Sequence, residues 1–138
     1  MDLIDGNLPH IEFVFPGPTR DRIVAAVQAG DKTATSSLLR EHEITGDPVP
    51  AVGDTGAVLD SAGQPVCMIR TVDVDIVALR DVPLAHARAE GEGYESVGDW
   101  RRGHLRFWTS EVMRAELGTG FPVDDDTLIV LERFIVIG

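Results

Sequence analysis

The apolar positions of the chain fall mainly into runs that are typical of strands. Apolar, largely β-branched residues follow one another almost without interruption from 127 to 137, which predicts a buried strand. Residues 55–60 and 65–79 form two further runs, and the turn residues 61–64 between them predict a hairpin. A shorter extended segment is predicted at 11–15, before the helix-entry sequence Pro16-Gly17-Pro18.

The second arm of the predicted hairpin shows a two-residue period. Asp73 and Asp75 share one parity, so the face of the strand that carries them is predicted to meet water. The inner face is predicted from the apolar side chains of the other parity, which are Val66, Met68, Val72, Val74 and Ile76.

Helix-forming segments lie between these strands. Thr19 is predicted as the N-cap of a helix that runs to about Ala29, with Gly30 as its C-terminal stop. A short helix is predicted from near Pro83 to residue 91, and Ser96 is the predicted N-cap of a longer one. Strands predominate and helices occupy the connections, so the predicted fold class is α+β, a β-barrel with flanking helices.

The composition is that of one globular domain. The 138 residues are 43% hydrophobic and 25% charged, which is enough apolar material for a core. No apolar run approaches the roughly 20 residues that cross a bilayer, and residues 1–5 lack the basic and apolar regions of a secretory signal. The sequence therefore predicts a cytoplasmic protein without a membrane partner. The single cysteine, Cys67, is predicted to be a small buried apolar residue.

The charge balance restricts the partners of the chain. It carries 23 acidic and 12 basic residues, a net charge of −11. Tight binding to long nucleic acid depends on Lys and Arg that displace counterions from phosphates. A long RNA or DNA track is therefore disfavoured, though not excluded, and a small ligand or a short RNA is the expected partner. The oligomeric state is left open.

Lys32 and Thr35 are the first candidates for chemistry. They lie three positions apart on an irregular turn that follows a predicted helix. A hydroxyl becomes a good nucleophile when a base accepts its proton, and an uncharged lysine can be that base. The alternative is a solvated Lys32 beside a turn-forming Thr35, and spacing alone favours this alternative.

His86 and Glu90 are the second candidates. They lie four positions apart and share a face of a predicted helix, as an acid/base pair or two metal ligands would. The spacing alone favours a simple hydrogen bond between them. Because Cys67 is isolated and no third ligand has convincing spacing, neither a metal nor a cofactor is predicted.

An aromatic stripe marks the longer predicted helix. Trp100 and Trp108 could stack a nucleobase, although such a stripe is usually core, and His104 on the same stripe is expected to be a core or rim residue. The acidic run 124–126 is expected to be a solvated strand entry rather than a cation site.

With these segments the chain resembles the ASCH family, a branch of the PUA-like superfamily. The family signature is Gly-x-Lys-x-x-Thr-x-Arg after the first helix, and here Gly30, Lys32 and Thr35 match while Ser37 replaces the arginine. The resemblance spans residues 12–136 of a single domain, 1–138, and looks like the longer bacterial members. Three further segments match in order: Val52-Gly53-Asp54, His86-Ala87-x-x-Glu90-Gly91 and Trp100-x-x-x-His104-x-x-Phe107-Trp108.

The resemblance implies a PUA-like barrel with a cleft lined by these segments. Related proteins are thought to bind RNA, and a small bacterial branch removes the acetyl group from N4-acetylcytidine with a lysine, a threonine and a glutamate. Carried over position by position, these catalytic roles fall on Lys32, Thr35 and Glu90. Substrate contacts are expected from the other positions of the cleft: Ser37, Arg40, His86, Trp100, His104 and Trp108.

The predicted function is therefore hydrolysis of an amide of a modified nucleoside such as N4-acetylcytidine. In one scheme Thr35 attacks the carbonyl, Lys32 accepts its proton, and Glu90 orients the lysine or protonates the leaving amine. In the other, a charged Lys32 stabilises the oxyanion and Glu90 is the base.

Ser37 bears on the choice of substrate. Because Ser37 stands where the family has an arginine, the forked donor that an arginine offers to phosphate is absent, and this favours an uncharged nucleoside as substrate. Arg20, Arg40 or Arg70 could supply positive charge from elsewhere in the fold. Two alternative functions stay open: a non-catalytic RNA-binding module, and a ribonuclease that uses the same cleft.

Overall fold

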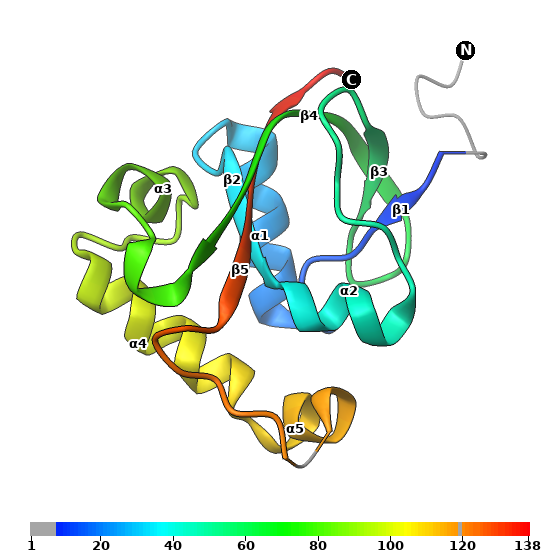
Figure 1. The fold of residues 1–138 in the computed structure, drawn as a ribbon. Coiled ribbons are helices and arrows are strands. Elements are labelled where there is room, and N and C mark those ends of the chain that lie inside the picture. The colour runs from blue at the N-terminus through cyan, green and yellow to red at the C-terminus, as the bar shows by residue number, and fades with distance from the viewer. Residues whose placement is uncertain (1–7, 119) are drawn as a thin grey trace.

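One mixed sheet organises the structure, a computed structural model that describes residues 8–118 and 120–138. Its strand order is β1-β3-β4-β5-β2. β1 (His10–Ile11) pairs in parallel with β3 (Thr55–Leu59), and the neighbours β4 (Pro65–Ala78), β5 (Leu128–Val136) and β2 (Ala34–Leu38) pair antiparallel. The long β4–β5 pair forms the centre of the sheet (Figure 1).

Helices occupy the connections, so the α+β class is confirmed. They are α1 (Pro18–Ala29), α2 (Leu39–Thr45), α3 (Leu84–Ala89), α4 (Val97–Trp108), α5 (Glu111–Leu117) and the 3₁₀ turn η1 (Leu79–Asp81). Figure 1 shows α3 and α4 together on one side of the β4–β5 pair, with β1 and β3 at the opposite end of the molecule. Among the described residues, no helix combines the length and the apolar character that a membrane span requires.

The predicted barrel is not confirmed. In the described chain the ladder ends with β1 at one edge and β2 at the other, so these strands do not close the sheet. The described fold is a five-stranded mixed sheet with helices on it.

Two apolar clusters hold the sheet and helices together. One lies under α3, α4 and α5, and includes Leu79, Trp100, Trp108, Met113 and Ile129. The other lies under α1, and includes Phe13, Ile23, Val27, Ile69 and Phe134. Cys67 belongs to the second cluster and is 4% exposed, which confirms its prediction as a buried apolar residue.

The chain before α1 differs from its prediction. Only His10–Ile11 is a strand, and Val14 adopts a positive φ of 53° instead of continuing an extended segment. The buried Arg20 explains the turn, because its guanidinium donates to the carbonyls of Phe13 at 3.2 Å and Val14 at 2.6 Å. The predicted N-cap Thr19 is also wrong, since α1 begins at Pro18 after Gly17 and has no side-chain cap.

The inward parity predicted for β4 is wrong. Cys67 and Ile69 are buried there, whereas Val72 and Ile76 of the predicted inner face are 42% and 43% exposed. A register shift between Thr71 and Asp73 changes the phase of the strand, so that no single parity stays inside along its length. The prediction that Asp73 and Asp75 meet water is confirmed, because both are exposed.

The other predicted elements are confirmed, and two short helices were missed. The hairpin β3–β4, strand β5, helix α3, the Gly30 stop and the Ser96 N-cap are all present, and Ser96 accepts from the Asp99 amide at 3.0 Å. The missed helices are α2 and α5. Both are seven residues long, which is too short for a helical period to stand out from the sequence.

Candidate functional site

Glu90 is the centre of a buried polar cluster. It caps α3 and its side chain is 1% exposed, yet its carboxylate accepts hydrogen bonds from Trp100 Nε1, from Ser36 Oγ at 2.9 Å and from His104 Nε2 at 3.1 Å. Burial by itself would raise the pKa of Glu90, but hydrogen bonds with His104 and His86 and the charge of Lys32 hold it well below its usual range. Glu90 is therefore held as a buried anion.

Lys32 supplies the nearest positive charge. Its side chain is 2% exposed, and its Nζ lies 3.8 Å from Glu90 Oε1 and 3.6 Å from Glu92 Oε2. The ammonium also donates to the backbone carbonyl of Glu90 at 3.2 Å and lies 5.7 Å from the centroid of the Phe13 ring. The two residues that head the predicted site are thus brought together as a buried ion pair.

The backbone around Lys32 explains how the pair forms. Gly30 ends α1 in a left-handed conformation, and the amide of Lys32 then turns back to the Ala26 carbonyl at 3.1 Å. The Thr33 amide donates to the Ala89 carbonyl at 2.8 Å, which fixes the turn against the end of α3. Gly91 lies against the same turn with a φ of +68°, and a Cβ there would come 2.4 Å from the Asp31 carbonyl oxygen.

Ser36 and His86 complete the cluster. Ser36 Oγ lies 2.7 Å from His86 Nε2, and the same nitrogen lies 3.3 Å from Glu90 Oε2. His86 is buried on α3, one turn before Glu90, whereas Ser36 is only partly buried on β2. Hydroxyl, imidazole and carboxylate therefore meet at one place.

Thr35 and Ser37 lie on the other face of β2. Successive side chains of a strand point to opposite faces, so the contact of Ser36 with Glu90 directs both neighbours away from the cluster. Ser37 Oγ instead lies 2.9 Å from His42 Nε2 on α2. Within the described residues the hydroxyl of Thr35 makes no hydrogen bond to Lys32 or Glu90.

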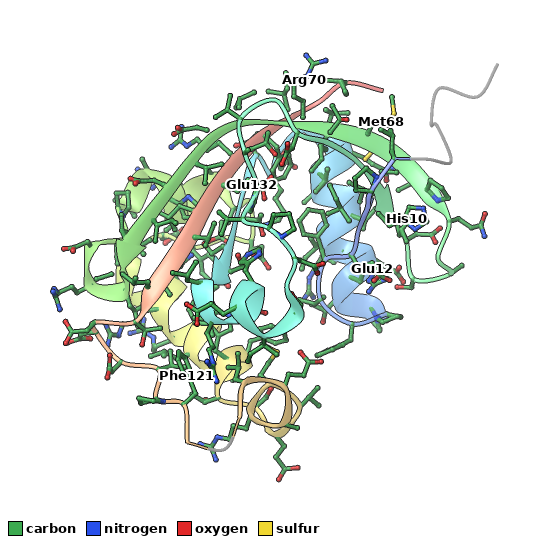
Figure 2. All side chains as sticks on the ribbon, turned by 45° about the vertical axis from the view of Figure 1, so that its right-hand side comes forward. His10, Glu12, Met68, Arg70, Phe121 and Glu132 are labelled. Atoms are coloured by element: carbon green, nitrogen blue, oxygen red, sulfur yellow. The ribbon has the colours of Figure 1, made fainter. Side chains whose placement is uncertain are left out.

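Thr35 faces a second carboxylate, that of Glu132. The two residues are direct partners in the β2–β5 ladder, and Glu132 accepts a hydrogen bond from Thr71 Oγ1 at 2.7 Å. Burial raises the pKa of Glu132, and the hydrogen bond from Thr71 lowers it by less. Figure 2 labels Glu132 on the side of the sheet that carries α2 and the loop after it.

The aromatic residues of α4 pack around Glu90. The Trp100 and His104 rings are stacked with centroids 4.3 Å apart, and Trp108 meets His104 edge-on at 5.1 Å. Trp100 is 0% exposed and Trp108 is 2% exposed, so neither indole presents a face to a ligand in this structure. Trp100 acts here as a hydrogen-bond donor to the carboxylate.

Arg40 lies apart from this cluster. Its guanidinium donates to the Leu117 carbonyl at 3.5 Å, lies 3.8 Å from Glu43 and covers the Phe121 ring at 5.3 Å. These contacts join α2 to the end of α5. Of the predicted substrate contacts, Arg40 and Ser37 therefore lie away from the Lys32–Glu90 pair. His86, Trp100 and His104 lie beside that pair.

Three residues offer the donor atoms of a metal site. One ligand atom from each of Glu90, Glu92 and His104 lies within 4.8 Å of the others. However, the ammonium of Lys32 already lies between the two carboxylates, at 3.8 and 3.6 Å. A divalent cation would have to displace Lys32, so the donor set is better matched to the lysine that the chain provides.

Comparison with known families identifies the chain. A family model described as ASCH domain matches residues 12–138, nearly the whole sequence. The chain belongs to the ASCH domain family. No curated protein matches its sequence.

Solved ASCH structures share the fold. The ASCH domain from Lactobacillus crispatus JV V101 has a TM-score of 0.81 at 27% identity, covering 94% of this chain and 79% of the other. Protein EF3133 from Enterococcus faecalis V583 has a TM-score of 0.80 at 28% identity, with coverages of 94% and 76%. The hypothetical protein PH0355, at 13% identity and a TM-score of 0.54, shares the fold alone, over 85% of this chain and 93% of its own.

Sequence reasoning missed several residues of this ASCH domain site. They are Ser36, Glu132 and Tyr94, whose ring centroid lies 5.7 Å from that of His104. Strand alternation could have identified Ser36, because adjacent hydroxyl residues on a strand point to opposite faces of the sheet. The ladder that sets Glu132 opposite Thr35 joins segments nearly a hundred residues apart, and no local pattern marks it.

Proposed function

We propose that this ASCH domain hydrolyses an amide on a modified nucleoside such as N4-acetylcytidine, at the cluster around Lys32 and Glu90. The observation that carries the proposal is the buried ion pair itself. Lys32 Nζ and Glu90 Oε1 lie 3.8 Å apart, and both side chains are at most 2% exposed. Burying two charges costs more free energy than packing apolar side chains of similar size, and such perturbed groups concentrate at functional sites.

The surrounding charge favours a neutral substrate. Glu92 lies beside Lys32 at 3.6 Å, and the chain as a whole carries a net charge of −11. Because both repel phosphate, a free nucleoside fits the site better than a polynucleotide. Lys32 is also the only lysine of the sequence, so a phosphate track would have to be built from arginines.

An apolar groove offers a place for the nucleobase. Phe15 and Phe107, whose ring centroids are 6.0 Å apart, line a hollow of about 310 Å³ together with Val14 and Pro16. Phe15 is 43% exposed, in contrast to the buried tryptophans. Two connections link the groove to the cluster. Its residues Val14 and Pro16 follow Phe13, whose ring lies against Lys32, and its residue Phe107 lies on α4, the helix that carries His104. Exposed aromatic rings supply the stacking surface that a base requires.

The test is turnover of N4-acetylcytidine by the purified protein. Glu90→Gln keeps the shape of the side chain and removes its charge, so it is expected to lower kcat/KM by about 10²–10⁴-fold. Glu95→Gln is the matched control, because Glu95 is an exposed carboxylate near the site in sequence, and it is expected to keep full activity.

A labelled RNA is incubated in parallel. Deacetylation that Glu90→Gln abolishes supports the proposed hydrolase. Cleavage of RNA with the nucleoside left intact would assign a ribonuclease instead, and binding of RNA without turnover of either substrate would assign a binding module.

A further inference from the structure

The three adjacent hydroxyls of β2 differ in what they contact. Ser37 contacts His42, and Thr35 faces Glu132 across the ladder. Of these three hydroxyls only that of Ser36 reaches the buried cluster, where it lies 2.7 Å from His86 Nε2 and 2.9 Å from Glu90 Oε2. A nucleophile must lie within hydrogen-bond reach of the base that takes its proton. Ser36 and Ser37 both lie this close to an imidazole, but only Ser36 does so inside the buried cluster, because the partner of Ser37 is His42 on α2.

We propose that Ser36 is the nucleophile of this site and that His86 is its general base. The inference rests on the proposed amide hydrolysis and adds a covalent step to it, with a small acyl group as the part of the substrate that is transferred. It moves the nucleophile by one residue from Thr35, the position that matches the family signature. Because adjacent strand residues point to opposite faces, this step of one residue changes which side of the sheet the nucleophile faces.

The exposure of the cluster agrees with these roles. The side chains of Lys32, His86 and Glu90 are 2%, 3% and 1% exposed, so none of them offers a surface to a substrate. Ser36 is only partly buried. Ser36 is therefore more exposed than the three groups around it, which agrees with its assignment as the attacking residue.

The covalent step passes through an acyl-Ser36 ester. The Ser36 hydroxyl, which donates its one proton to Glu90 in this structure, first turns that proton toward His86 Nε2. Ser36 Oγ then forms a bond to the acyl carbon as the proton moves to the imidazole. The carbon–nitrogen bond then breaks, and His86 returns the proton to the leaving amine, which departs as the free nucleoside. Water attacks the acyl-Ser36 ester with His86 again accepting a proton, and Ser36 leaves as a hydroxyl once more, so that the products are the amine and the carboxylic acid.

Glu90 acts through His86 in this scheme. Its carboxylate lies 3.3 Å from His86 Nε2, so it stabilises the imidazolium that forms when Ser36 attacks. Trp100, His104 and Lys32 surround the same carboxylate and keep it ionised. A carboxylate held as an anion by such donors is a weak base, and for this reason the proton of Ser36 is assigned to His86.

The test is covalent labelling by an alkyl fluorophosphonate, followed by peptide mass mapping. An activated serine displaces fluoride and keeps the phosphonyl group, and no nucleoside is needed. We expect the adduct on Ser36 in the wild-type protein, and labelling slowed at least about tenfold in His86→Gln. Ser37→Ala and Thr35→Ala are matched controls from the same strand and are expected to label as the wild type does.

A purely structural role for Ser36 gives a different result. Ser36→Cys provides the second readout, because a thiol beside His86 is expected to react with iodoacetamide faster than the buried Cys67 and to lose this advantage in the His86→Gln background. An adduct on Thr35, or a folded wild-type protein that takes no adduct together with an unreactive Ser36→Cys thiol, would overturn the proposal.

Failure of the inference and failure of the proposed function are distinguishable. An adduct on Ser36 without turnover of N4-acetylcytidine would support Ser36 as the nucleophile and contradict N4-acetylcytidine as the substrate. If Ser36 is the nucleophile, Ser36→Ala is expected to lose about 10³-fold or more in kcat. If this variant still turns over N4-acetylcytidine at the wild-type rate, the proposed function is supported and Ser36 is not the nucleophile.

Discussion

Gly91 and Lys32 approach each other backbone to backbone. A Cβ on Gly91 would lie 2.8 Å from Lys32 Cα and 2.4 Å from the Asp31 carbonyl oxygen, distances at which the backbone must shift. The approach sets the residue after Glu90 directly against the turn that carries Lys32. The glycine therefore determines how closely the two charged side chains of the candidate site can meet.

We predict that Gly91→Ala damages both stability and the site. The substitution forces an alanine into a left-handed conformation, φ +68°, and creates a clash with backbone that no side-chain rotation relieves. The left-handed conformation alone costs about 1–2 kcal/mol, and with the clash we expect a loss of about 3 kcal/mol or more in the free energy of unfolding. Chemical denaturation measures it.

Gly93→Ala is the matched control for this prediction. Gly93 also has a positive φ, +87°, but among the residues that the structure describes a Cβ there would meet no atom within 4 Å. Gly93→Ala should therefore lose only the free energy of unfolding that the left-handed conformation costs, with no further loss from a clash. Equal losses for the two variants would mean that the approach to Lys32 is not what requires a glycine at 91.

We predict that Glu90 makes the fold sensitive to acid. Its pKa is held below the ordinary value of 4.5, so its carboxylate contributes stability that is fully present above about pH 4.5 and is lost as the pH falls toward the lowered pKa. Glu90→Gln removes this contribution, and we expect a loss of about 3–5 kcal/mol at neutral pH. The difference in the free energy of unfolding between wild type and variant should decrease below pH 4.5, by up to about 1.4 kcal/mol per pH unit.

Glu132→Gln provides the opposite sign in the same titration. Burial raises the pKa of Glu132, so protonation is favoured in the folded state and acidification stabilises the wild type relative to the variant. Glu132→Gln is therefore expected to be more stable than the wild type at neutral pH and Glu90→Gln less stable, and both differences in the free energy of unfolding should shrink on acidification. Parallel series for both variants would contradict the assignment of charge at the two glutamates.

We predict a late titration of Tyr94, the only tyrosine of the sequence. Burial, followed by the charges of Glu92 and Glu90, raises its pKa from 10.0 to about 12. The ultraviolet absorbance of the phenolate measures this value directly, with circular dichroism to confirm that the protein is still folded. Glu92→Gln should lower the midpoint and Glu95→Gln should leave it unchanged. A midpoint near 10.0 in the folded wild type would place Tyr94 away from the acidic cluster.

Much of the secondary structure follows from local pattern. The β-branched run of β5, the Gly30 stop and the Ser96 cap are consequences of residue type within a few positions, and each is where the sequence predicts it. The errors have non-local causes. The turn at Val14 depends on the guanidinium of Arg20, and the phase of β4 depends on a register shift against β5.

The sequence by itself determined the family, the α+β class and the residues from which a site could be built. Only the tertiary structure decided how these residues are grouped. His86 and Glu90 are neighbours because one helical turn joins them, whereas Lys32 and Ser36 reach them only because β2 and the turn before it pack against α3. Strand alternation then divides Ser36 from Thr35. A one-dimensional pattern records spacing along the chain, but which face meets which helix depends on the packing of distant segments.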